Sequence, residues 1–122
     1  EIKLSHRYNL DLTVLRLCVK DYELFAPQFQ EVALNVLGLI FKHLLRDIDI
    51  VAHLNRSDYF AVILPCTPPE GAHVLSNRIL QEVENFRLKP FHDDRRIMGM
   101  NVEIYDARIY FEQEEELIRI FR

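Results

Sequence analysis

Residues 46–65 read RDIDIVAHLNRSDYFAVILP, and this stretch decides how the rest of the chain is interpreted. It contains two short apolar segments, 50–54 and 59–64, on either side of the polar residues 55–58. Asn, Ser and Asp side chains bond to nearby backbone groups and favour turns, whereas runs rich in Val, Ile and Phe favour strands. The stretch therefore predicts a β-hairpin.

An amphipathic helix is predicted on each side of this hairpin. Between residues 28 and 46 apolar side chains recur every three or four residues, and Pro27 is a typical helix start. The apolar face of this helix consists of Phe29, Val32, Val36, Leu37, Ile40 and Leu44. Prolines then interrupt the chain within residues 65–69, and a second stripe follows at Ala72, Leu75, Ile79, Val83 and Phe86. We expect both helices to pack on the same sheet.

Further strands complete the pattern at both ends. Residues 12–19 are rich in Leu and Val and predict an interior strand, and residues 100–111 alternate enough for one or two strands. We expect an exposed polar connection at 87–96 and a short acidic helix at 114–121. The order strand, helix, strand, strand, helix, strand is the split arrangement of ferredoxin-like sheets. The predicted class is therefore α+β, with a ferredoxin-like, palm-type antiparallel sheet and helices on one or both of its faces.

Length and composition restrict the class of protein. A chain of 122 residues with 49% hydrophobic residues can form one compact core, so we predict a single folded domain over residues 1–122. The net charge of -4 argues against binding of a nucleic-acid polymer, which needs a concentrated basic face. No apolar run approaches the length of a membrane span, so we expect a cytoplasmic domain. Because the sequence opens at Glu1 without Met, we expect a piece of a larger multidomain protein, which can itself be attached to the inner membrane.

Cysteine and histidine residues give no sign of a metal site. Cys18 and Cys66 lie in separate apolar segments, which predicts two buried free thiols and fits a reducing compartment. The five histidines are scattered and show no spacing typical of metal ligands. The residues themselves therefore predict no metal ion.

The hairpin and its flanking helices resemble the GGDEF family of diguanylate cyclases. Members of that family carry Arg-x-x-Asp, a short strand, a Gly-Gly-Asp/Glu-Glu-Phe turn and a strand that closes in Leu-Pro. Here Arg46 and Asp49, then Phe60, then residues 64–65 fall into that frame, with one extra residue in the turn. The resemblance covers roughly residues 10–86 and implies the GGDEF-like form of the predicted fold.

Several departures from the family's pattern imply that the catalytic machinery of the family is absent here. In the family the turn glycines let the backbone approach the nucleotide, and converging carboxylates hold the metal ions of phosphoryl transfer. Here residues 55–57 replace the glycines, Tyr59 replaces the second acid, and residues 17–19, Leu-Cys-Val, stand where members have Asp, hydrophobic, Asp. We therefore expect no enzyme activity, no catalytic residue, no metal and no cofactor. The enzymatic alternative has to place a displaced metal site on Asp58 and Asp21.

A second feature of the family remains. Many cyclases bind their product, cyclic di-GMP, at an inhibitory site built on Arg-x-x-Asp, with a further Arg from the next helix. The resemblance places Arg46, Asp49 and Arg78 at these positions. An Arg can donate paired hydrogen bonds to guanine O6 and N7 and stack on a purine, and a carboxylate can accept from the opposite edge. By itself, an Arg and an Asp at this spacing are more often a surface ion pair worth under about 1 kcal/mol.

Two hypotheses follow. The first is a catalytically inactive receptor, similar to the PelD-like degenerate members of the family, that binds cyclic di-GMP as a regulatory ligand through Arg46, Asp49 and Arg78. It would regulate a partner protein or adjacent domains of its own chain, in exopolysaccharide and biofilm signalling. The alternative is a ligand-independent interaction or dimerisation module derived from a cyclase fold, which could form a homodimer. A different purine dinucleotide stays open as the ligand.

Overall fold

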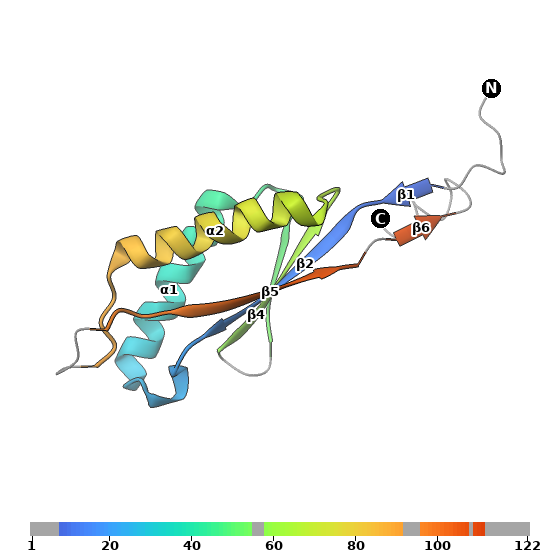
Figure 1. Cartoon of the computed structure of the whole chain (residues 1–122). Coiled ribbons are helices and arrows are strands. Elements are labelled where there is room, and N and C mark those ends of the chain that lie inside the picture. The colour runs from blue at the N-terminus through green and yellow to red at the C-terminus, as the bar shows by residue number, and fades with distance from the viewer. Residues whose placement is uncertain (1–7, 55–57, 92–95, 108, 112–122) are drawn as a thin grey trace, which may run out of the picture.

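The computed structural model of the chain describes residues 8–54, 58–91, 96–107 and 109–111. Figure 1 shows helices α1 and α2 together on one side of the main sheet, and the strand pair β1–β6 projecting beyond the sheet. The elements in chain order are β1 (Tyr8–Leu10), β2 (Leu12–Val19), a 3₁₀ turn (Tyr22–Leu24), α1 (Pro27–Leu44), β3 (Ile50–His53), β4 (Tyr59–Pro65), α2 (Pro69–Phe86), β5 (Met100–Asp106) and β6 (Ile109–Phe111).

The main sheet has four strands in the order β3-β4-β2-β5, all antiparallel. Strand β2 is central, with Leu17 opposite Phe60 of β4 on one side and opposite Val102 of β5 on the other. Strands β1 and β6 form a separate antiparallel ribbon. This arrangement of strands and helices confirms the predicted α+β, ferredoxin-like class.

The core lies between the two helices and one face of the sheet. Residues of β2 and β4 are buried alternately, as expected for a sheet covered on one face. The face toward the helices carries Thr13, Leu15, Leu17, Val19, Phe60, Val62 and Leu64. The helices contribute Ala33, Leu37, Ile40, Ala72, Ile79 and Val83. Each fully buried Leu or Val contributes about 1.5–3 kcal/mol relative to an exposed one, so this layer is the main source of stability.

The ends of the helices bring two connections together. Helix α1 starts with a proline in its first turn and ends at Leu44, where Leu45 turns to an extended conformation with φ -86° and ψ 150°. Helix α2 likewise starts with Pro69 and ends where Arg87 adopts the left-handed conformation, with φ 52°. The chain leaving α1 runs beside the turn that enters α2, because Arg46 after α1 donates hydrogen bonds to the Pro65 carbonyl and to Thr67 Oγ1.

Most of the predicted elements are confirmed. The strand at 12–19 has the predicted bounds, the hairpin appears as β3 and β4, and residues 100–111 form two strands. Strand β1 and the 3₁₀ turn were not predicted. The helix expected at 114–121 and the turn residues 55–57 lie outside the described residues.

Several expectations were wrong. Val32 and Phe86, predicted on the apolar faces of the two helices, are exposed. Cys66 is exposed rather than buried, because it lies in the turn directly after β4 with a positive φ of 56°, while Cys18 is half-buried. The connection at 87–96, expected to be polar and exposed, is exposed at Arg87, Lys89 and Arg96, but two of its apolar residues anchor it to the core. Leu88 and Phe91 pack against the core, and the Leu88 carbonyl accepts a hydrogen bond of 2.7 Å from the Met98 amide.

No helix in the described part of the chain is long and apolar enough to cross a membrane.

Candidate functional site

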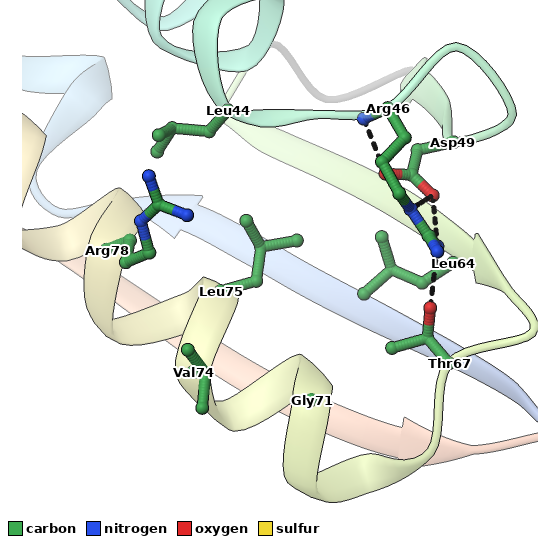
Figure 2. Close-up of a pocket in the computed structure, with 9 residues that line it drawn as sticks. All are labelled: Leu44, Arg46, Asp49, Leu64, Thr67, Gly71, Val74, Leu75 and Arg78. Carbon is green, nitrogen blue, oxygen red and sulfur yellow. Dashed lines mark hydrogen bonds and ion pairs between the residues drawn. The ribbon is translucent and has the colours of Figure 1, made fainter.

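The Arg-x-x-Asp motif forms a turn that closes on itself directly after α1. The Asp49 amide donates to the Arg46 carbonyl at 3.0 Å, and the Arg46 amide donates to Asp49 Oδ2 at 2.8 Å. An Asp side chain that accepts from a nearby amide stabilises a turn, so the fold of this segment follows from the spacing of the two residues. The turn places both side chains on the same side of the backbone (Figure 2).

The two side chains are paired with each other. Arg46 Nη2 lies 2.8 Å from Asp49 Oδ1, and Arg46 Nε lies 3.2 Å from both carboxylate oxygens. The Asp49 side chain is only 2% exposed, whereas that of Arg46 is 50% exposed. These hydrogen bonds raise the pKa of the Arg46 guanidinium above its ordinary value, against the opposite effect of partial burial. Arg46 is therefore a permanent cation whose outer side faces solvent.

Residues at the end of β4 and in the turn before α2 also hold the Arg46 guanidinium. Arg46 Nη2 donates to the Pro65 carbonyl at 2.9 Å and to Thr67 Oγ1 at 2.6 Å. The positive φ of Cys66 bends the chain so that its two neighbours present both acceptors to one nitrogen. Arg46 thus joins the end of α1, the motif turn and the entrance of α2.

A cavity of about 280 Å³ opens beside this group, lined by Leu44, Arg46, Asp49, Leu64, Thr67, Gly71, Val74, Leu75 and Arg78. Figure 2 shows Arg78 on α2 reaching toward Leu44, with Leu64 and Leu75 between the two arginines. Arg78 is exposed, and no carboxylate among the described residues forms an ion pair with it. The structure thus brings all three predicted site residues to one cavity, which holds two guanidinium groups and one carboxylate already paired.

The position at which the sequence resemblance implies metal ligands in the cyclases holds different groups here. Cys18 of β2 faces Asp58, with Sγ 3.7 Å from Oδ2, and Asp58 is buried. Next to them the Arg16 guanidinium lies over the Tyr59 ring, 4.5 Å from its centroid. Across the described ranges, no group of three or more His, Cys, Asp or Glu residues is placed to hold a metal ion.

A larger cavity of about 450 Å³ lies near the end of β2, lined by Lys20, Asp21, Pro90, Phe91, Arg96, Ile97, Met98 and Gly99. The Arg96 guanidinium lies 5.3 Å from the Phe91 ring centroid. Residues 92–95, between Phe91 and Arg96 in the sequence, lie outside the described part of the chain. Lys20, Arg96 and Asp21 give this cavity two cations and one carboxylate, as in the smaller cavity, which also holds Thr67 and all three predicted site residues.

Comparison with known proteins identifies the fold. No protein-family model and no curated protein matches the sequence. Solved structures do match, among them the active GGEEF domain of a diguanylate cyclase from Vibrio cholerae, with a TM-score of 0.63 and 18% identity. The GGDEF domain of DgcB from Caulobacter crescentus, in complex with cyclic di-GMP, matches with a TM-score of 0.65 and 13% identity. The fold is that of GGDEF domains.

The GGDEF fold extends over most of this chain. The match covers 77% of it for the Vibrio domain and 78% for DgcB, but only 60% and 58% of those two chains. The diguanylate cyclase SiaD from Pseudomonas aeruginosa, solved with its activator SiaC, matches 89% of this chain and 42% of its own, with a TM-score of 0.66 and 15% identity. At these identities the likeness establishes the fold alone.

Sequence reasoning missed part of the site. The spacing of Arg46 and Asp49 signals a turn, and the GGDEF resemblance points to Arg78, but nothing local marks Thr67 or the Pro65 carbonyl. Both reach Arg46 only because β4 ends in a sharp bend beside the exit of α1. The one available signal was the cluster of prolines around Thr67, which predicts a rigid turn.

Proposed function

We propose that this GGDEF-fold chain is a catalytically inactive receptor that binds cyclic di-GMP in the cavity formed by Arg46, Asp49 and Arg78. The observation that carries the proposal is the charge of this cavity. Two guanidinium groups line it, and its one carboxylate is paired and covered, although the whole chain has a net charge of -4. A local excess of positive charge in an acidic protein suits an anionic ligand.

The lining groups match the parts of a purine dinucleotide. Guanidinium groups bind phosphate and the O6 and N7 acceptors of guanine, and aliphatic side chains such as those of Leu44 and Leu75 can cover the face of a base. A cavity of about 280 Å³ is at the lower end of sizes for small-ligand pockets. We therefore expect one guanine and its phosphate to enter the cavity, with the rest of the dinucleotide outside it.

Asp49 positions Arg46 in this proposal. Its covered carboxylate accepts hydrogen bonds from Arg46 Nε and Nη2 and so fixes the direction of the guanidinium. The direct contact between Asp49 and a guanine edge that the resemblance implies is not part of the proposal, because Arg46 covers the carboxylate. Asp49 therefore contributes to ligand binding through Arg46.

Arg78 provides the first test of the receptor. Replacing Arg78 with alanine should weaken cyclic di-GMP binding about tenfold, because it removes one charge-assisted contact at an exposed position. Isothermal titration calorimetry measures the change. Arg87→Ala is the matched control, since it removes a guanidinium just beyond the C-terminal end of the same helix and should bind as wild type does. Equal affinities for wild type and Arg78→Ala would contradict the role of Arg78.

The absence of enzyme activity is the second test. Cyclase chemistry needs converging carboxylates on metal ions, and here Asp58 faces a thiol while Tyr59 lies under Arg16. We expect no cyclic di-GMP and no pyrophosphate after incubation with GTP and Mg²⁺ or Mn²⁺, measured by chromatography against an active cyclase. Turnover that disappears in Asp58→Ala would instead support the enzymatic alternative.

The biological output forms part of the same proposal. We propose that ligand binding in the cytoplasm regulates a partner protein or adjacent domains of the same chain, as in the PelD-like receptors of exopolysaccharide and biofilm signalling that the sequence resembles. The free energy for such regulation comes from a difference in ligand affinity between two arrangements of the assembly. The solved complex of SiaD with its activator SiaC supports a protein partner for domains of this fold in general.

The exposed edge of the sheet favours a second candidate function, a ligand-independent interaction module. Strand β3 is the outer strand of the four-stranded sheet, and large apolar side chains along it and beside it are exposed: Ile48, Ile50, Val51 and Leu54. An apolar edge strand can pair with a second chain. If Arg46→Ala leaves assembly and phenotype intact while Val51→Lys disrupts them, this module replaces the receptor.

A further inference from the structure

We infer that Thr67 is a positioning residue for the ligand site, holding the Arg46 guanidinium in the orientation that the ligand meets. The inference rests on the proposed receptor function. Thr67 Oγ1 accepts a hydrogen bond of 2.6 Å from Arg46 Nη2, the shortest of the contacts made by that guanidinium. Its own hydroxyl hydrogen is directed to the Pro65 carbonyl at 3.1 Å. Donor and acceptor capacity of the hydroxyl are thus both used at this junction.

Thr67 is itself held in place by the fold. Thr13, fully buried on the central strand β2, donates its hydroxyl to the Thr67 carbonyl at 2.7 Å. On the other side a Cβ at Gly71 would lie 3.2 Å from Thr67 Cγ2, so the absence of a side chain at Gly71 leaves room for the Thr67 methyl group. The hydroxyl therefore has a defined direction, set by β2 below and by the first turn of α2 beside it.

These contacts use only part of the hydrogen-bonding capacity of the Arg46 guanidinium. Nε and Nη2 point inward, to the Asp49 carboxylate, the Pro65 carbonyl and Thr67. Within the described part of the chain, nothing accepts a hydrogen bond from Nη1. This leaves Nη1 and the outer face of the guanidinium for the ligand. A group whose rotamer is already fixed loses less entropy on binding, so Thr67 contributes affinity without touching the ligand.

The test compares Thr67→Val with Thr67→Ser. Valine keeps the branched shape but removes the hydroxyl, and we expect calorimetry to show about tenfold weaker binding of cyclic di-GMP, the effect of one lost hydrogen bond to a charged group. Serine keeps the hydroxyl and should bind within about threefold of wild type. In an Arg46→Ala background, Thr67→Val should cause no further loss, because the group that it positions is gone. For the weakly binding variants, the affinity is measured by NMR titration with cyclic di-GMP at millimolar concentration.

A ligand-free measurement separates the inference from the proposed function. We expect the Arg46 Nε–H signal in NMR spectra to exchange with water faster in Thr67→Val than in wild type and in Thr67→Ser. If Thr67→Val binds as wild type does, or weakens binding equally without Arg46, the inference is wrong and the ligand site stands. If the wild-type chain binds no cyclic di-GMP, the proposed function is wrong. Unchanged Nε–H exchange in Thr67→Val overturns the positioning role whatever the ligand.

Discussion

Arg46→Ala is expected to weaken cyclic di-GMP binding by about 100-fold or more, the largest effect of any single change in the site. The substitution removes the cation that three segments of the chain hold at the edge of the cavity. It also leaves the Asp49 carboxylate, 2% exposed in the native structure, without its partner and facing an anionic ligand. The loss of the cation and the repulsion between the uncovered acid and the ligand act together, so the effect exceeds the loss of one contact.

Calorimetry against wild type measures this effect, and two variants make it specific. Arg46→Lys keeps the charge but lacks the planar fork that serves Asp49, Thr67 and the ligand together, so we expect a loss of about tenfold or more. Arg46→Ala combined with Asp49→Ala removes the unpaired acid and should bind less poorly than Arg46→Ala. Binding by Arg46→Ala within threefold of wild type would contradict the receptor proposal, provided that thermal melting shows the variant to be folded.

Leu37→Ala is expected to lower the free energy of unfolding by about 3–4 kcal/mol, the largest effect on stability that we predict. Leu37 is fully buried on the face of α1 that packs into the core. Removing its side chain loses transfer free energy and leaves a cavity that the sheet and α2 fill only in part. Since domains of this size are stable by about 5–15 kcal/mol, the variant should unfold at a clearly lower urea concentration.

Leu39 offers a control on the same helix. Its side chain is 60% exposed, so Leu39→Ala changes the same chemical group in water and should shift the free energy of unfolding by less than about 0.5 kcal/mol. Equilibrium urea denaturation of both variants, followed by circular dichroism, gives the comparison. Similar midpoints for Leu37→Ala and Leu39→Ala would show that the face of α1 assigned to the core is wrong.

Local patterns were enough to predict the main elements. Apolar spacing distinguished the two faces of α1 and α2, and the polar residues after 54 separated β3 from β4. The three residues of β1 carry too little pattern, because a short strand is defined by its partner, here Ile109–Phe111 of β6. Cys66 was misplaced for a similar reason. Its apolar neighbours predicted burial, but it lies in the turn directly after β4 with a positive φ and is exposed.

In the site, too, contacts between residues close in sequence could be predicted, and contacts between distant residues could not. Arg46 and Asp49 are close in sequence, so their turn could be predicted from spacing, and a family resemblance was needed for Arg78. The contact between Arg46 and Thr67 depends on how strand β4 ends and on the Thr13 hydroxyl, which lies 54 residues before Thr67. No window of sequence contains these groups together. The covering of Asp49 by Arg46 likewise follows only from the folded structure.

The central place of β2 also governs how this chain can fold. Thr13 of β2 pairs with Leu64 of β4 on one side and with Asp106 of β5 on the other, so β2 meets β5 only after both helices and two further strands have been synthesised. Such distant pairings slow folding, since a long loop must close before they form. Until β5 is synthesised, one edge of this central strand stays open to other chains. A ribosome-bound or truncated chain that stops before residue 100 should therefore depend on chaperones to avoid aggregation.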